Sequence, residues 1–291
     1  MNAMTAPQRR AGVLGTHSID SFVFTVHDLN EAARFYSAFG LDVQVAQGPL
    51  ELRTAGNPHS WGTLHEGPGP KRLQYLRLGI YAQDRAGFAE TIRSRGLAIA
   101  PHPLSDGKGL WLSTPDGTPL QLVVADKVSP SAKCVPLPVP MIRPGQGAAP
   151  SRSRRPRVRP RTLSHLLLFT PDVARMIAFC EDILGLRMSD RSGNVIAFLH
   201  GPHGSDHHLL AFAKSHAPGL HHSSWDVGSI DEVGGGAGQR RAAGYGRGWG
   251  LGPALGWGPS WGWGWNGGPV TVEPVVERKF ELTVEIVDAR R

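Results

Sequence analysis

The chain has 291 residues, of which 40% are hydrophobic, and a formal net charge of +7. This length fits two ordinary domains, or two small modules that share an interface. Two cysteines are too few for a disulfide framework. No apolar run reaches membrane-spanning length, and the first residues lack the apolar core of a secretory signal. A cytoplasmic protein is therefore expected.

A first module is expected at residues 15–125. The stretch SFVFTVHDLNEAARFYSAFGLDV (21–43) contains a short apolar strand, an aspartate near a turn, an amphipathic helix and a closing Gly-Leu. A strand is expected in 72–82, a helix in 84–97, and a hairpin-like pair of strands around the Pro-Asp-Gly turn of 109–125. The residues before this module are expected to be a loose tail.

Residues 126–161 are rich in proline, serine, alanine and arginine and have no hydrophobic period. They end in SRSRRPRVRPR, whose six arginines carry most of the net charge. A basic, proline-rich run without interleaved aromatic residues is typical of a solvated linker, so nucleic-acid binding is not expected.

The second half, 162–291, repeats the first in outline. HLLLFTPDVARMIAFCEDILGLRM again places a strand before an aspartate, a helix and Gly-Leu, with Asp172 expected to cap the helix and Gly185 to end it. Strands are expected in NVIAFLHG, HHLLAFAKS and HHSSWDVGS. The order predicts an α+β fold of tandem βαβββ modules with mixed, curved sheets.

The end of this half has an unusual composition. A further helix is expected after residue 229, but its glycines should weaken it by roughly 1 kcal/mol each relative to alanine. Residues 234–268 are dominated by glycine and tryptophan. Compensating frameshifts in a GC-rich gene would produce a glycine- and tryptophan-rich sequence of this kind. The alternative is a functional tryptophan-rich tail.

Two histidines are expected to open strands, His165 in HLLLFT and His222 in HSSWDV. Two neutral imidazoles and one carboxylate form the facial triad that holds Fe(II) and leaves coordination positions open. Spacing alone also fits structural histidines, so the residues by themselves leave both interpretations open.

The segments around these histidines resemble a known family. SHLLLFTPDVARMIAFCEDILGLRMSDR, HHLLAFAKS and LHHSSWDVGSIDEVG are similar to the catalytic module of extradiol dioxygenases of the vicinal oxygen chelate (glyoxalase/bleomycin resistance) superfamily. The resemblance covers about residues 15–233. It implies an Fe(II) enzyme, with Mn(II) as second choice, that cleaves a small aromatic diol with O2 in aromatic hydrocarbon catabolism, and it implies a homo-oligomer.

The resemblance also implies site residues. His165 would be the first metal ligand, and one residue of the 221/222 pair the second, with His222 favoured. His208 would be the pocket histidine that assists proton transfer. Counting along the family pattern places the third ligand at Glu273. His207 and His221 are expected to face away from their neighbours.

Departures from the family pattern put the activity in doubt. Asn266, Gly267 and Pro269 replace the Asp, Pro and Gly of the turn before the third ligand. The family's later histidines and tyrosine are replaced, and no histidine follows His222. The positions concerned are Ala254, Gly262 and Trp263.

The first module resembles the family's non-catalytic module. Ser21 or Asp20 stands near the place of His165, and Gln121 stands where a ligand glutamate would be, so a scaffold is expected. Three other functions stay open: a catalytically inactive protein of the same fold that binds an aromatic compound or a partner; a glyoxalase-like lyase or isomerase using Gln121; and nucleic-acid binding by the arginine run.

Overall fold

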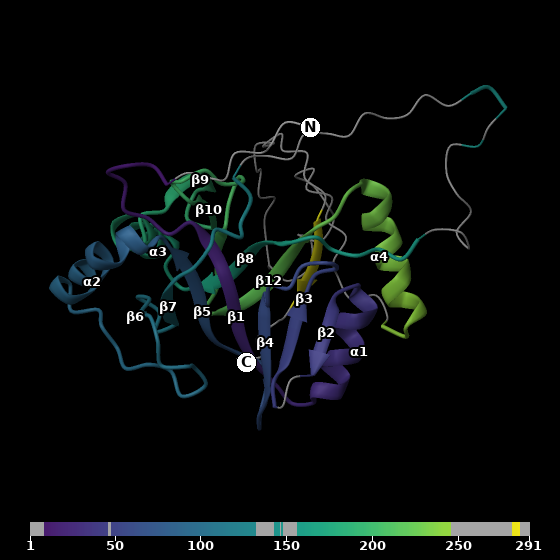
Figure 1. The fold of residues 1–291 in the computed structure, drawn as a ribbon, viewed down its shortest axis with the longest axis horizontal. Coiled ribbons are helices and arrows are strands. Elements are labelled where there is room, and N and C mark those ends of the chain that lie inside the picture. The colour runs from purple at the N-terminus through teal and green to yellow at the C-terminus, as the bar shows by residue number, and fades with distance from the viewer. Residues whose placement is uncertain are drawn as a thin grey trace.

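The computed structural model describes residues 9–45, 48–131, 143–145, 147, 156–245 and 281–285. These residues form a mixed α+β fold with two mixed sheets, one from each half of the chain (Figure 1). No helix in the described part of the chain is long and apolar enough to cross a bilayer.

The first half contains β1 Ser18–Val26, α1 Leu29–Phe39, β2 Asp42–Val45, β3 Leu50–Arg53, β4 Gly62–Glu66, β5 Arg72–Ile80, the 3-10 helix η1 Ala82–Asp84, α2 Arg85–Ser94, β6 Leu110–Ser113 and β7 Pro119–Val124. The second half contains β8 Leu163–Thr170, α3 Val173–Asp182, β9 Arg187–Ser192, β10 Ile196–His200, β11 Leu210–Lys214, β12 Gly219–Asp226, α4 Ile230–Ala242 and β13 Glu281–Glu285.

The two sheets repeat one pattern of pairing. The seven-stranded sheet has the order β2-β3-β4-β1-β5-β7-β6, and the six-stranded sheet has the order β13-β12-β8-β11-β10-β9. In each sheet the first strand of the half, β1 or β8, pairs parallel with one neighbour and antiparallel with the other. This repeat confirms the expected mixed sheets and relates positions in β8 to positions in β1.

The helices that follow β1 and β8 begin at the expected aspartates. The Asp28 carboxylate accepts hydrogen bonds from the backbone N–H groups of Asn30 and Glu31, and Asp172 accepts one from Arg175. Each bond satisfies a donor that a helix leaves free in its first turn. Gly40 ends α1 with a φ of 112°, a conformation that favours glycine.

One hydrophobic core joins the two halves. The same cluster of buried side chains contains Phe39 of α1 and Trp225 of β12, whose ring centroids are 6.5 Å apart. Burial of a large apolar side chain contributes roughly 1.5–3 kcal/mol, so contacts of this kind stabilise the halves together.

Both ends of the proline- and arginine-rich segment pack against these halves. The Ser18 hydroxyl accepts hydrogen bonds from the N–H groups of Val128 and Ser129. Near the other end, Val158 N–H donates to the Gln239 side chain, which itself donates to the Ala38 carbonyl. Val158 thus lies beside both α1 and α4, which run side by side at one end of the molecule (Figure 1).

Residues 9–17 contact both halves, although a loose tail was expected before the first module and Arg10, Ala11, Gly12 and Leu14 are exposed. Thr16 N–H donates to the Leu184 carbonyl at 2.9 Å, and Arg9 forms an ion pair with Asp84. The residues from Arg9 to His17, called the strap below, therefore connect the first half to the second. Sequence periodicity missed these contacts because they join segments that are distant in the chain.

Candidate active site

Two neighbouring strands bring His165 and His222 together. In the antiparallel pair of β8 and β12, His165 lies opposite Ser224, and His222 lies opposite Leu167. The two rings approach with their Nε2 atoms 3.2 Å apart, and both residues are buried. Both strands begin before these histidines, so the expectation that His165 and His222 open them is wrong.

The separation of these nitrogens fits two ligands of one cation. Metal–nitrogen bonds of about 2.1 Å at a right angle place two imidazole nitrogens about 3 Å apart. The same separation also accommodates a hydrogen bond between the rings. The donor set and its spacing therefore fit a divalent metal.

The other ring nitrogens of this pair have their own partners. His165 Nδ1 lies 3.3 Å from the Ser164 hydroxyl, and His222 Nδ1 lies 2.9 Å from His221 Nδ1. Burial lowers the pKa of His221 to about 4, so His221 is neutral near pH 7 and its Nδ1 can accept a hydrogen bond from His222 Nδ1–H. That tautomer leaves the His222 Nε2 lone pair available to a metal. Hydrogen-bond partners of ligating histidines commonly fix the tautomer in this way.

A third histidine completes a cluster of rings. The His208 ring lies with its centroid 4.1 Å from that of His165, and its edge meets Phe198 at 4.9 Å. Its Nδ1 lies 3.0 Å from His207 Nδ1. The structure thus brings His165, His208 and His222 together at one side of the second sheet.

The expectation that His207 and His221 face away from their neighbours is wrong. Each places its Nδ1 within 3.0 Å of the Nδ1 of the histidine that follows it. The register of β12 shifts between Leu220 and His222, so the pair 221/222 sits at a bulge, where the strict alternation of a strand is lost.

Glu273, which was expected to be the third ligand, lies outside the described residues. Within the described ranges, no group of three or more histidine, cysteine, aspartate or glutamate side chains is arranged to hold a metal ion. The backbone of β13 pairs antiparallel with β12, and this register places Glu285 opposite His222. Glu285 was not expected from the local sequence, because its place opposite His222 follows only from the pairing of β13 with β12.

Comparison with known proteins places the chain in a family. The model of the Glyoxalase/Bleomycin resistance protein/Dioxygenase superfamily matches residues 162–246. Metapyrocatechase 2 of Cupriavidus necator is 46% identical over 230 residues, which cover 79% of this chain and 71% of the relative. This chain belongs to the extradiol dioxygenases of that superfamily.

Solved structures show the same fold at lower identity. A Mn(II)-bound glyoxalase from Novosphingobium aromaticivorans is 20% identical, with a TM-score of 0.59 over 79% of this chain and 72% of that one. The 2,3-dioxygenase LapB from Pseudomonas sp. KL28 is 18% identical, with a TM-score of 0.58 over 79% of this chain and 82% of that one.

In this extradiol dioxygenase the first module fills the face that corresponds to the histidine cluster. The Tyr75 ring packs against the rings of His102 and Trp111, with centroids 5.1 and 5.0 Å away. The Gln121 amide donates to the Lys108 carbonyl at 2.9 Å and to Asp106 at 3.3 Å. The side-chain nitrogen of Gln121 is therefore engaged within the first module.

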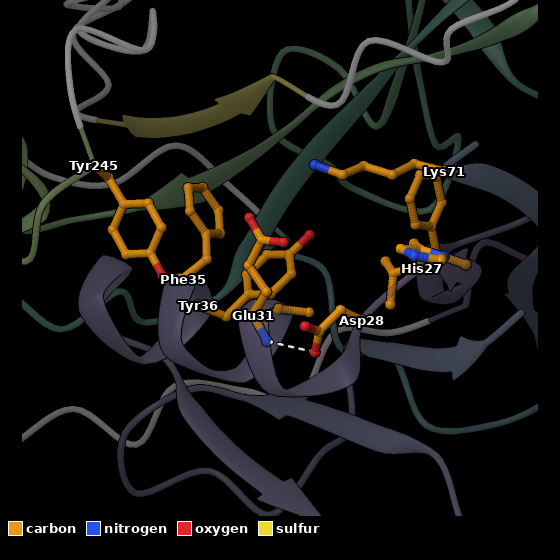
Figure 2. A pocket seen from close by; sticks show the side chains of 10 residues that line it. His27, Asp28, Glu31, Phe35, Tyr36, Lys71 and Tyr245 are labelled. Atoms are coloured by element: carbon orange, nitrogen blue, oxygen red, sulfur yellow. Dashed lines mark hydrogen bonds between the residues drawn. The ribbon is translucent and has the colours of Figure 1, made fainter. Parts of the chain in front are cut away.

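A cavity of about 280 Å³ lies elsewhere in the dioxygenase, between α1, the end of β1 and the residues after α4 (Figure 2). Phe35, Tyr36 and Tyr245 line it together with charged side chains, and none of the three clustered histidines does. Asp28, on its wall, is the cap of α1, and its hydrogen bond with the Glu31 N–H is visible in Figure 2. This cavity is distinct from the histidine cluster.

Proposed function

We propose that the chain cleaves the ring of a catechol-type aromatic diol with O2, at an iron(II) ion held by His165, His222 and Glu273. The observation that carries the proposal is the 3.2 Å separation of the two histidine Nε2 atoms. Membership of the extradiol dioxygenases supplies the reaction. Iron is preferred over manganese because two imidazoles and one carboxylate with open positions suit non-haem Fe(II) and O2.

Bound iron would acidify the diol and provide the electron density that O2 activation requires. The chain's own contribution is placement and proton transfer. His165 and His222 come from adjacent strands of one sheet, which fixes the direction of both rings. His208, whose ring is tilted against that of His165, would take a proton from a diol hydroxyl and return one to the product, a task that suits an imidazole.

We infer that turnover is slow relative to relatives with a complete C-terminal region. Positions where the family has later histidines and a tyrosine are occupied by Ala254, Gly262 and Trp263. Loss of a residue that orients a ligand or substrate commonly costs about 10–100-fold in activity. The competing function is an inactive protein of the same fold that binds an aromatic compound, which these same replacements favour.

Metal binding to single variants tests the site. We predict that the wild-type chain, titrated with Fe(II) without oxygen, retains one iron per chain after desalting, whereas His165→Ala and His222→Ala retain almost none because each removes a ligand. His207→Gln is the matched control, since it changes a histidine beside the cluster and should retain iron. Equal iron content in wild type and both alanine variants would refute the site.

The identity of the carboxylate needs a separate pair of variants. Glu273→Gln should weaken iron binding by about tenfold or more, because a neutral amide replaces the anionic ligand. Glu285→Gln should leave the affinity unchanged. The reverse pattern would assign the carboxylate to the strand beside β12 and exclude Glu273. Light scattering of the iron-bound protein would test the homo-oligomer that we also propose.

A further inference from the structure

The loop that carries His208 is enclosed by the other half of the protein. This loop, residues 201–209, connects β10 to β11 and is called the 201–209 loop below. It contacts two segments of the first half, the strap and the turn from β5 into α2, and it also contacts the start of the linker at Ser131. The loop's position is therefore set across the junction of the halves.

The centre of this junction is a buried aspartate, Asp84, which pairs with a partly exposed arginine beside a histidine. Arg9 donates to both carboxylate oxygens of Asp84, and the His203 Nε2 lies 3.8 Å from Asp84 Oδ2. Asp84 is 2% exposed and the His203 side chain is 0% exposed. The ring of Tyr81 closes the cluster by meeting the His203 ring edge-on at 5.2 Å.

The hydrogen bonds define the state of His203. The Arg10 backbone N–H donates to His203 Nδ1 at 3.2 Å, so Nδ1 carries no proton. The remaining ring proton is then on Nε2, which faces the Asp84 carboxylate. Burial lowers the pKa of His203, so the neutral ring persists near pH 7.

Close backbone contacts hold the rest of the loop. A side chain at Gly201 would lie 3.1 Å from the Thr16 carbonyl oxygen, and one at Gly204 would lie 2.9 Å from the Ser131 carbonyl oxygen. At the far end of the loop, the Ser189 hydroxyl donates to the carbonyl of His207. The residue before His208 is thus fixed from the second sheet, and the start of the loop is fixed from the first half.

We propose that Asp84 and His203 are positioning residues, which hold the 201–209 loop so that His208 keeps its place against His165. Neither residue touches the histidine cluster, so they act through the loop. The first module, which was expected to be only a scaffold, would then also position a residue of the active site. It rests on the proposed function, because it assumes that His208 transfers a proton.

Amide hydrogen exchange tests the anchoring without any turnover. Asp84→Asn removes the charge that pairs with Arg9 and should speed exchange in residues 201–209. Glu90→Gln is the matched control, because it breaks an exposed ion pair with Arg93 on the same helix, α2. His203→Gln is the second variant if Asp84→Asn does not fold. Unchanged exchange in the loop of the folded variants overturns the proposal.

A double-mutant cycle tests the effect on His208. With iron bound, Asp84→Asn should lower kcat by about tenfold with KM within about twofold, and this loss should vanish in a His208→Gln background. Multiplicative losses, or a lower melting temperature with unchanged kcat, overturn the positioning role. If His208→Gln alone leaves kcat unchanged, the proton-transfer role of His208 fails, while the exchange experiment still decides whether Asp84 anchors the loop.

Discussion

His17 shows how a single buried side chain makes the stability of this protein depend on pH. It is fully buried, its ring lies 4.4 Å from that of Tyr81, and its Nδ1 is 3.0 Å from the Ser18 hydroxyl. Burial lowers its pKa from 6.5 to about 4, because the charged ring would lose its hydration. The folded protein therefore holds His17 neutral over a range where the unfolded chain binds a proton.

We predict that the free energy of unfolding falls as the pH drops from about 6.5 to about 4. In this range the imidazole of His17 binds a proton in the unfolded state and stays neutral in the folded state. His17 contributes at most about 1.4 kcal/mol per pH unit in this window. Urea unfolding across the window should give a shallower pH dependence for His17→Gln than for wild type. His27→Gln, at an exposed histidine, should keep the wild-type slope, and identical slopes for all three would contradict the account.

The sequence predicts the role of a single residue best when its partners lie within a few residues along the chain. Asp172 caps its helix as expected, and Asp28, which was expected only to lie near a turn, caps α1 in the same way, because a cap requires only the next three residues. The pairing of His165 with His222 was expected from the family resemblance. The partnership of His221 with His222 was not, because it depends on a bulge that no local pattern reveals.

At the scale of elements, helix α4 forms although its sequence is rich in glycine, which disfavours a helix. Ser229 and Glu232 explain its start: Glu232 N–H donates to the Ser229 hydroxyl at 3.3 Å, and the Glu232 carboxylate accepts from the Gly228 N–H. This resembles a capping box, except that the carboxylate bonds the N–H of the residue before the cap. Val233 is buried, and Gln239 connects α4 to Ala38 of α1. Tertiary contacts thus offset the glycines.

Alanine substitutions in α4 should distinguish free positions from crowded ones. Gly234 and Gly238 are exposed, and a side chain at either would meet nothing within 4 Å. Each change to alanine should stabilise the protein by about 0.5–1 kcal/mol, because alanine loses less backbone entropy in a helix. Gly235→Ala is the control: its methyl would lie 3.0 Å from Val158 Cγ2, so its gain should be smaller. Equal gains at all three positions, measured by thermal unfolding, would contradict this packing.

The molecule as a whole is held together by contacts that the local sequence pattern could not predict. The strap passes over Gly185, which has a φ of 66° and lies directly against the backbone of Leu14 and Gly15. Helical and strand periodicity predicts elements within each half. It contains no information on which distant segments meet, so the strap and the packing of residues 126–131 and 156–161 became visible only in the structure.

Gly185→Ala should be strongly destabilising, because it adds a collision with the strap to the cost of a left-handed backbone. Gly193 is the matched control, since it has a φ of 50° and open space around it. Gly193→Ala should cost about 1–2 kcal/mol, the usual cost of that conformation for a residue with a side chain. Gly185→Ala should cost clearly more in denaturant unfolding, and a loss no larger than that of the control would show that the strap does not press on this position.

Ring cleavage is tested by mass spectrometry of the products after incubating the iron-loaded protein with catechol under ¹⁸O₂. We expect a ring-opened product with the mass of the substrate plus one O2, containing two labelled oxygen atoms, in wild type and not in His222→Ala. Wild-type protein that holds one iron per chain, binds catechol and yields no such product would contradict ring cleavage by this chain.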